Sequence, residues 1–310
     1  MASAYPQYNA AIPYTTPATR LQTLDIWLPR PLATSSAYSP RFQTWLVYVH
    51  GGAWRDPAQT SLCIQPAIKH LQHSHSTAVN HITGLASINY RLSPYPDHST
   101  DPSSPTDDQR NVRHPVHVTD IHLALNYLRK QYHLERWIGV GHSCGATLLL
   151  QLASGIGLAR QPVGLPSPAT GLHGLILLEG IYHIPLLLQN HSPPTCPESI
   201  SQIYKDIVLG AFGQDAVAQE EASPVSGTYT QVPRGCRVVL GHSPQDELVE
   251  EEQRAVMFQR LREDGWVTQS RPGAKAEDEK TVEQRDLHGV HDQIWEDGKQ
   301  IAQLIADMIG

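Results

Sequence analysis

A serine stands between two glycines in the segment 141–145, whose sequence GHSCG fits the pattern G-x-S-x-G. Mostly apolar residues precede it at 137–140, and an apolar run follows at 146–153. This order predicts a buried strand, a sharp turn and a helix. Such a turn holds the serine in a strained conformation and exposes its hydroxyl above the edge of a sheet. The glycines fit because a Cβ at either position would clash where strand and helix cross. We therefore take Ser143 as the candidate nucleophile.

This serine needs two partners, because its hydroxyl is a weak nucleophile at neutral pH. A histidine must take the proton, and a carboxylate must orient and stabilise that histidine. In strand–turn–helix sites of this type the chain order is serine, acid, histidine. Asp246 follows the predicted strand 237–241 by five residues, and His291 lies just before the last predicted helix, 293–309. Open α/β sheets gather functional residues at the carboxyl ends of their strands. The predicted triad is Ser143, Asp246 and His291.

The acid and the base each have alternatives nearby. Glu247 and Glu250 also carry carboxylates, but they enter the next predicted helix, where the helix dipole favours acidic residues in any protein. Asp246 is preferred because it lies nearest the end of the strand. His288 is the alternative base, and His291 is preferred because it comes immediately before the helix.

A glycine pair follows the predicted strand 45–49 and could complete the site. The segment consists of His50, Gly51, Gly52, Ala53 and Trp54. Glycine pairs after a strand let successive backbone N–H groups converge on an anion, and an H-G-G motif at this point supplies half of an oxyanion hole. Cys144 is expected to add its backbone N–H rather than its thiol, because the turn exposes the central residue. An ordinary strand-end turn is the alternative interpretation. We expect His50 to brace the glycine loop and His142 to be a packed neighbour.

Buried strands alternate with amphipathic helices along most of the chain. Strands are predicted at 24–28, 45–49, 85–90, 137–140, 171–178 and 237–241, and helices at 62–72, 116–134, 146–153, 250–264 and 293–309. Crossovers of this type give a mostly parallel sheet flanked by helices, so the predicted fold class is α/β. No internal repeat or second core is evident, which predicts a single domain over 1–310.

Three segments depart from this alternation. Residues 94–113 are polar and rich in Ser, Pro and Asp, which predicts an exposed loop. Residues 183–232, with weak helices at 200–209 and near 216–222, form either a cap over the carboxyl edge of the sheet or a plain connection. Residues 273–283 are charged and poor in apolar side chains, which predicts a disordered loop.

Composition and charge exclude several classes of partner and cofactor. The chain has 310 residues and a formal net charge of −7, and without a basic stripe nucleic acid is not expected as a partner. The four cysteines are scattered, so no disulfide framework is expected. His70, His73 and His75 come nearest to a metal cluster but lie in a polar helix end, so neither metal nor cofactor is expected. The chain shows no signal peptide and no apolar run near the ~18 residues of a membrane span, which predicts a cytoplasmic protein.

Taken together, four segments resemble the kynurenine formamidases (arylformamidases), in particular the fungal type, within the α/β-hydrolase superfamily. These segments are 50–54 (HGGAW), 141–146 (GHSCGA), 243–249 (SPQDELV) and 291–295 (HDQIW). The resemblance extends over residues 25–309. Its H-G-G-x-W motif is fairly informative, whereas G-x-S-x-G is shared by the related esterases.

This resemblance implies an α/β-hydrolase fold and hydrolysis of the small molecule N-formyl-L-kynurenine to L-kynurenine and formate in tryptophan breakdown, without a metal. The nucleophile, acid and base of the family map to Ser143, Asp246 and His291. The oxyanion donors map to the backbone N–H groups around Gly52 and Ala53, together with that of Cys144.

Substrate recognition is less well determined by the sequence. Trp54 and Tyr182 are candidates to line a pocket for the aromatic ring, with core packing as an equal alternative. A cation for the substrate carboxylate is needed, but the sequence does not choose among the arginines. A homodimer is one option for the assembly. The competing functions are a general carboxylesterase or amidase of the same fold and a non-catalytic binding protein.

Overall fold

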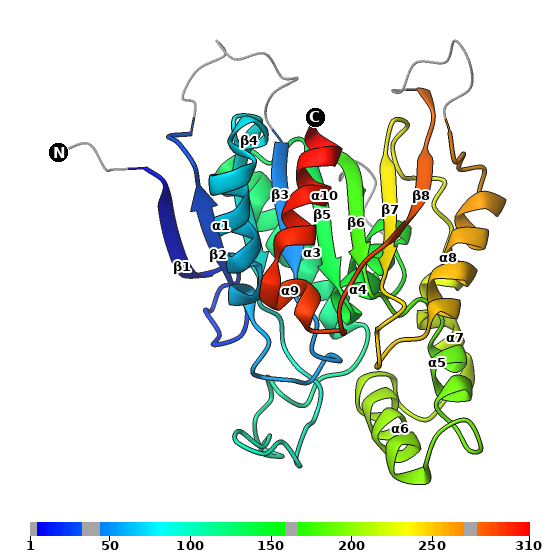
Figure 1. Cartoon of the computed structure of the whole chain (residues 1–310). Helices are drawn as coiled ribbons and strands as arrows, with labels where there is room; N and C mark the ends of the chain where they lie inside the picture. Colours follow the sequence, from blue (N-terminus) through cyan, green and yellow to red (C-terminus); the bar gives the residue numbers. More distant parts are fainter. Residues whose placement is uncertain (1–4, 33–43, 159–166, 270–277) are drawn as a thin grey trace.

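An eight-stranded sheet forms the centre of the computed structural model, which describes residues 5–32, 44–158, 167–269 and 278–310. The strand order is β1-β2-β4-β3-β5-β6-β7-β8. The strands are β1 (Gln7–Pro13), β2 (Thr23–Leu28), β3 (Thr44–Val49), β4 (Ile82–Ile88), β5 (Trp137–His142), β6 (Leu172–Leu178), β7 (Arg237–His242) and β8 (Thr281–Asp286). The pairs β1–β2 and β2–β4 are antiparallel and the others are parallel. The predicted α/β class is confirmed (Figure 1).

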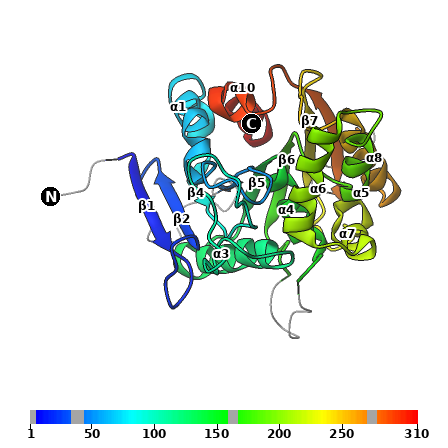
Figure 2. The same cartoon turned by 90° about the horizontal axis from the view of Figure 1, so that it is seen from below.

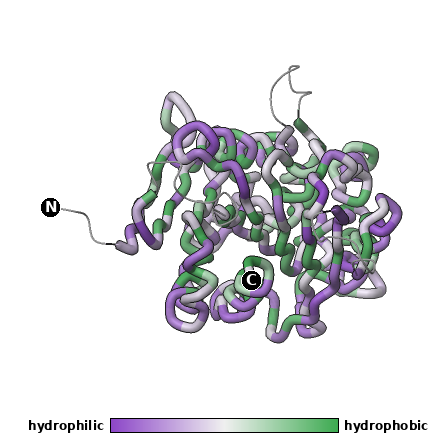
Figure 3. The backbone as a smooth tube through the Cα atoms, turned by 90° about the horizontal axis from the view of Figure 1, so that it is seen from above, coloured by the Kyte–Doolittle hydropathy of each residue, from purple (hydrophilic) through white to green (hydrophobic). Residues whose placement is uncertain are grey.

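Helices cover both faces of this sheet (Figures 1 and 2). One face packs against α1 (Gln65–Ser74), α9 (Gln293–Asp297) and α10 (Lys299–Ile309), with α2 (Ser76–Val79) beside them. The other face packs against α3 (Val116–Tyr132), α4 (Cys144–Ser154) and α8 (Glu251–Glu263). Every residue of β3 and β5 is buried, as expected of central parallel strands covered on both sides. Figure 3 shows hydrophobic and hydrophilic residues alternating along the covering helices.

The segment between β6 and β7 forms three helices beyond the carboxyl edge of the sheet, at the lower right of Figure 1. They are α5 (Ile184–Asn190), α6 (Glu198–Phe212) and α7 (Ala216–Ala222). The sequence predicts the second and third of these helices and misses α5. Since α5 and α6 pack against each other and against α7, they form a connected helical layer rather than an extended connection.

Two expectations about the carboxyl-terminal part are wrong. Disorder was expected over 273–283, yet Thr281–Glu283 begin β8, while 273–277 lie outside the described residues. This edge strand buries only Val282 and takes its order from backbone pairing with β7, so no apolar run marks it. The helix expected over 293–309 is broken at Gly298, where φ is +70° and a Cβ would lie 2.3 Å from the amide nitrogen of Ala67 in α1.

The loop 94–113 is mostly exposed, as its composition predicts, but it also has an ordered interior. Ser103 and Arg110 are buried within it. The Tyr95 amide donates to the Ser103 hydroxyl at 2.8 Å, and the Ser103 amide donates to the Tyr95 carbonyl at 3.0 Å. Polar side chains here satisfy the backbone internally, so a polar composition is compatible with a packed loop.

None of the helices in the described residues combines the length and apolarity that a membrane-spanning segment needs.

Candidate active site

The candidate nucleophile lies in a tight turn between β5 and α4. Ser143 has φ 54° and ψ −127°, a conformation that non-glycine residues rarely adopt. A Cβ on Gly141 would lie 2.7 Å from the Gly145 carbonyl oxygen, and a Cβ on Gly145 would lie 2.2 Å from the Val49 carbonyl oxygen. The two glycines are therefore required by close backbone approach, as the pattern predicts.

Asp246 and His291 form a hydrogen-bonded pair beside this turn. The His291 Nδ1 lies 2.8 Å from Asp246 Oδ2, and the Asp246 side chain is fully buried. The other oxygen, Oδ1, accepts the backbone N–H groups of Leu248 at 2.8 Å and Val249 at 3.0 Å. Burial acts to raise the pKa of Asp246, but its hydrogen bond to His291 and the charge of that ring outweigh burial and lower it. The carboxylate is thus held ionised and aimed at the ring.

The alternative acids and base do not occupy these positions. Glu247 accepts the backbone N–H of His291 at 3.0 Å rather than its ring. Glu250 binds the side chain of Gln253 at 2.7 Å. His288 is exposed and does not face the cavity.

Hydrogen bonds tie the loop that carries His291 to the loop that carries Asp246. The Ser243 hydroxyl donates to the Gly289 carbonyl at 2.7 Å, and the Gly289 amide donates to the Gln245 side chain at 2.7 Å. Two segments more than forty residues apart are therefore fixed in register, which sets the position of the ring relative to the carboxylate.

A second buried carboxyl group, which the sequence analysis does not predict as functional, lies behind this pair. Glu179 directly follows β6, has φ 50° and is fully buried. Its carboxyl group lies within 4.8 Å of that of Asp246, accepts the Ser243 amide at 2.9 Å and lies 2.8 Å from His242 Nδ1. Burial, and then the neighbouring Asp246, raise the pKa of Glu179 well above its usual range. Glu179 is thus a neutral acid that can donate to the triad carboxylate. Its place at the end of a strand is the same signal that identifies Asp246.

Among the described residues, two groups of three side chains have ligand atoms within 4.8 Å of one another. They are His142 with His291 and Asp292, and Glu179 with His242 and Asp246. Each contains one member of the Asp246–His291 pair. The absence of a metal stays a prediction from the sequence.

The glycine turn after β3 packs against the buried rings of Tyr90 and His50. The Tyr90 hydroxyl donates to the carbonyls of His50 and Gly51, both at 3.1 Å, and its ring stacks on the His50 ring at 4.5 Å. His50 Nδ1 lies 2.9 Å from the Gly51 carbonyl, so it braces the turn as expected. Three consecutive positive φ values, at Gly52, Ala53 and Trp54, turn the chain sharply here.

Cys144 joins this turn to the serine turn. Its Sγ accepts the Trp54 amide at 3.2 Å and lies 3.5 Å from the Tyr90 hydroxyl. Burial raises the pKa of the Cys144 thiol to about 11, which leaves it protonated and unreactive at neutral pH. The thiol is thus a structural contact between the two turns, and the expected role of the Cys144 backbone N–H stays a prediction.

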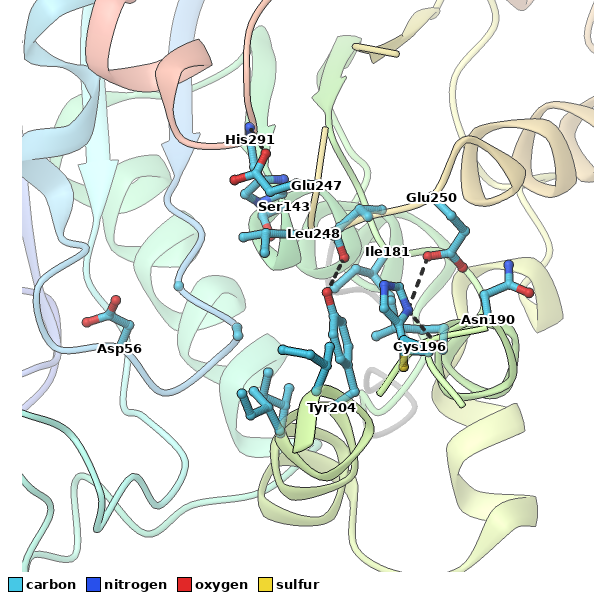
Figure 4. Close-up of a pocket in the computed structure, with 18 of the residues that line it drawn as sticks. Asp56, Ser143, Ile181, Asn190, Cys196, Tyr204, Glu247, Leu248, Glu250 and His291 are labelled. Atoms are coloured by element: carbon cyan, nitrogen blue, oxygen red, sulfur yellow. Dashed lines mark hydrogen bonds and ion pairs between the residues drawn. The ribbon is translucent and has the colours of Figure 1, made fainter. Parts of the chain in front are cut away.

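The two turns and the Asp–His pair open into one cavity of about 880 Å³. Gly52, Ala53, Ser143 and His291 all line it. In Figure 4, Ser143 and His291 lie on one side, and residues of the cap lie on the other. Among the described residues the Ser143 hydroxyl makes no hydrogen bond and is available to a ligand.

Trp54 and Tyr182, for which the sequence leaves pocket lining and core packing as equal alternatives, are not among the residues that line the cavity. Trp54 and Tyr182 are each 1% exposed. The Trp54 ring packs edge-on against Phe212 of α6 at 4.9 Å, and the Tyr182 backbone is held by Gln253 at 2.7 Å. Both belong to the hydrophobic core. Aromatic contact in the cavity comes instead from Tyr95 and Tyr204.

Curated proteins resemble this chain over nearly its full length, although no family model matches it. The kynurenine formamidase-like hydrolase fscH of Fusarium equiseti is 32% identical, covering 98% of this chain and 95% of that protein. The kynurenine formamidase avaC of Aspergillus versicolor is 34% identical, with 95% and 98% covered. The kynurenine formamidase of Meyerozyma guilliermondii is 30% identical, with 86% and 84% covered.

Solved structures agree on the fold. A truncated carbohydrate esterase from gut microbiota has a TM-score of 0.60 at 14% identity, covering 100% of this chain and 98% of the other. Esterase B from Lactobacillus rhamnosis has a TM-score of 0.59 at 15% identity, covering 98% and 86%. At such identities the likeness shows the α/β-hydrolase fold alone. Because relatives at least 30% identical cover almost the whole chain, this protein belongs to the kynurenine formamidase family.

Proposed function

We propose that this protein hydrolyses N-formyl-L-kynurenine to L-kynurenine and formate, with Ser143 as nucleophile. The substrate follows from the names of its relatives. The observation that carries the mechanism is the 2.8 Å hydrogen bond between Asp246 and His291 at the wall of the cavity that Ser143 also lines.

In the first half of the reaction Ser143 Oγ attacks the formyl carbon while its proton passes to Nε2 of His291. The tetrahedral intermediate then breaks its bond between carbon and nitrogen. His291 returns the proton to the departing aryl amine, so L-kynurenine leaves and a formyl ester remains on the serine. Asp246 stabilises the imidazolium of His291 while His291 carries this proton.

In the second half a water molecule attacks the formyl ester. His291 takes one proton from this water and passes it to Ser143 Oγ as formate leaves, which restores the enzyme. Formyl is the smallest acyl group, so the acyl side of the cavity needs little space. Backbone N–H groups of Gly52, Ala53 and Cys144 are the proposed donors to the oxyanion, and each such donor lowers the barrier by ~2.7–4 kcal/mol.

Residues 183–232 act in this proposal as a cap within a single domain. Asn190 of α5 and Tyr204 of α6 line the cavity opposite the serine turn. Cytoplasmic location and a homodimer remain predictions from the sequence.

Covalent labelling tests the nucleophile directly. Phenylmethylsulfonyl fluoride should sulfonylate Ser143, found by peptide mass mapping, and the loss of formamide hydrolysis should follow the labelled fraction. His291→Ala should slow the labelling because the base is gone. Hydrolysis that persists after complete modification of Ser143 would contradict the assignment, as would inactivation that tracks modification of the half-buried Cys196.

A further inference from the structure

Arg55 is a largely buried cation that makes no ion pair with the described residues. Three arginines are buried among the described residues, Arg55, Arg110 and Arg254. Arg110 pairs with Asp101 at 2.9 Å, and Arg254 pairs with Asp286 at 2.8 Å. Within the described part of the chain, the Arg55 guanidinium makes neither a hydrogen bond nor an ion pair, although the residue is only 8% exposed. Asp206, Asp56 and Asp97 favour its charge, but none of them lies within ion-pair distance, so the guanidinium keeps its N–H donors for a ligand.

The fold places this cation at the cavity wall. The Arg55 amide donates to the Gly52 carbonyl at 2.9 Å, which closes the glycine turn and sets Arg55 beside the proposed oxyanion donors. Arg55 lines the same cavity as Ser143, and it is the only arginine or lysine among the described lining residues. The adjacent Asp56 marks this wall in Figure 4.

A stacked ring fixes the plane of the guanidinium. The Arg55 Cζ lies 4.1 Å from the centroid of the Tyr95 ring. The loop that carries Tyr95 is anchored to the same turn, because the Ser93 amide donates to the Trp54 carbonyl at 2.8 Å. A guanidinium stacked on an aromatic face keeps its N–H donors free in the plane, where they match a carboxylate in bidentate fashion. Burial lowers the pKa of Arg55, yet an arginine stays charged at neutral pH.

The remaining charges of the cavity are mostly negative. Carboxyl groups of Asp56, Glu247, Glu250, Glu252 and Asp292 line it. These carboxylates would repel a substrate carboxylate along most of the cavity wall. The position beside the Arg55 guanidinium is where a negative charge is favoured.

We propose that Arg55 binds the α-carboxylate of the substrate, and that the enzyme thereby selects aryl formamides that carry a free amino-acid carboxylate. This rests on the proposed function. The formamide lies against Ser143 at one end of the substrate, and the amino-acid group reaches the Tyr95–Arg55 wall at the other. An ester or amide of the same carboxyl group lacks the charge that pairs with the guanidinium and binds less tightly.

Steady-state kinetics on three substrates test this inference. They are N-formyl-L-kynurenine, its methyl ester, and 2-formamidoacetophenone, which has no amino-acid group. For Arg55→Gln we expect KM for N-formyl-L-kynurenine to rise about 10-fold to 100-fold, because a hydrogen-bonded charge pair is lost. The change in kcat should be much smaller. Values of kcat/KM on the other two substrates should stay near those of the wild type. Arg55→Lys keeps the positive charge but not the paired N–H donors of the guanidinium. Its KM for N-formyl-L-kynurenine should lie between those of the wild type and Arg55→Gln.

Arg20→Gln is the matched control, since Arg20 is exposed and pairs with Asp107 on the surface. Arg20→Gln removes the same charge and should leave kcat and KM for all three substrates unchanged. Equal losses on all substrates for Arg55→Gln would overturn the proposal and make Arg55 a structural residue. Unchanged kinetics on the free acid would overturn it as well.

The wild type alone gives an independent measurement if the variant does not fold. L-Kynurenine should inhibit hydrolysis of 2-formamidoacetophenone at least about tenfold more tightly than L-kynurenine methyl ester does, for one charged hydrogen-bonded contact. Equal inhibition by L-kynurenine and its methyl ester would contradict the proposed carboxylate site without affecting the proposed function. Failure to hydrolyse any of the three formamides would instead contradict the proposed function.

Discussion

At the scale of single residues, a neutral carboxylic acid lies directly behind the carboxylate that orients the base. Glu179 and Asp246 are both buried, and two like charges this close in a buried site cannot both ionise cheaply. Asp246 has the hydrogen bond to His291 and two backbone N–H donors, so it keeps the charge while Glu179 keeps a proton. The proton on Glu179 can then be donated to Asp246, which fixes the carboxylate on both sides.

This arrangement predicts a pH dependence of stability. The pKa of Glu179 is raised on folding, so above the usual pKa of a glutamate the folded state binds one proton more than the unfolded state. Stability is therefore lost as pH rises through this range. Glu179→Gln keeps a neutral donor and removes the linkage. The free energy of unfolding of the variant should exceed that of the wild type by a margin that grows between about pH 5 and pH 8, at most ~1.4 kcal/mol per unit.

Urea unfolding of both proteins across this range measures the margin. A constant difference between the two would show that Glu179 is ionised in the folded protein and would contradict its role as a donor.

The choice of Asp246 over its acidic neighbour predicts unequal effects on turnover. Asp246→Asn should lower kcat on N-formyl-L-kynurenine by about 10³-fold to 10⁴-fold, because an amide neither selects the productive tautomer of His291 nor stabilises its charge. Glu247→Gln should lower kcat far less, because Glu247 accepts the backbone N–H of His291 and does not orient its ring. Comparable losses for the two variants would remove the basis for assigning the acid to Asp246.

The three residues of the proposed triad could be chosen from sequence because each follows a predicted strand or precedes a predicted helix. Glu179 satisfies the same rule, but a carboxyl at a strand end becomes interpretable only once Asp246 is known to lie against it. Arg55 could not be singled out either. Its lack of an ion pair with the described residues depends on loops that are brought together only in three dimensions.

At the scale of elements, the crossing of β3 with the turn before α4 sets the geometry of the site. The Cα of Gly145 comes so close to β3 that a methyl group would lie 2.2 Å from the Val49 carbonyl oxygen. No rotamer change relieves such a contact, because both partners are backbone. The position of the serine hydroxyl therefore depends on the absence of a single side chain.

Gly145→Ala should consequently destabilise the protein by about 3 kcal/mol or more and abolish turnover. Gly210→Ala is the matched control, because Gly210 lies inside α6 and a methyl group there meets no atom closer than 3.6 Å. In a helix interior this exchange should stabilise by roughly 0.5–1 kcal/mol. Thermal unfolding compares the two, and a Gly145→Ala variant with wild-type stability and activity would show that β3 and α4 do not cross this closely.

Elements with a strong apolar period are predictable from sequence, and those ordered by contacts elsewhere are not. β3, β5 and β6 are continuous apolar runs because helices cover both of their faces. The strand β8 buries Val282 alone and depends on pairing with β7, so its composition resembles that of a disordered loop. The break at Gly298 reflects the approach of α1, about which the local sequence contains no information.

At the scale of the whole molecule, the cavity is assembled from segments spread over most of the chain. The glycine turn, the Tyr95 loop, the serine turn, the cap and the last loop each contribute to its wall. A ligand bound there connects elements that are otherwise joined mainly through the sheet. Binding should therefore stabilise the whole fold.

L-Kynurenine should raise the unfolding temperature of Ser143→Ala, which binds without turnover. At a hundredfold excess over its dissociation constant the ligand adds about 2.7 kcal/mol to the free energy of unfolding. Differential scanning calorimetry across a concentration series measures this shift. An unfolding temperature that does not respond to L-kynurenine would show that the product does not bind the native state at these concentrations and would contradict this prediction.

The most direct test of the central claim is the steady-state rate on N-formyl-L-kynurenine beside that on p-nitrophenyl acetate, for the wild type and Ser143→Ala. We predict a far higher kcat/KM on the formamide than on the ester, and loss of both activities in the variant. Turnover of the ester alone would move the protein to the general esterases. Turnover of the formamide that survives in Ser143→Ala would contradict the proposed mechanism.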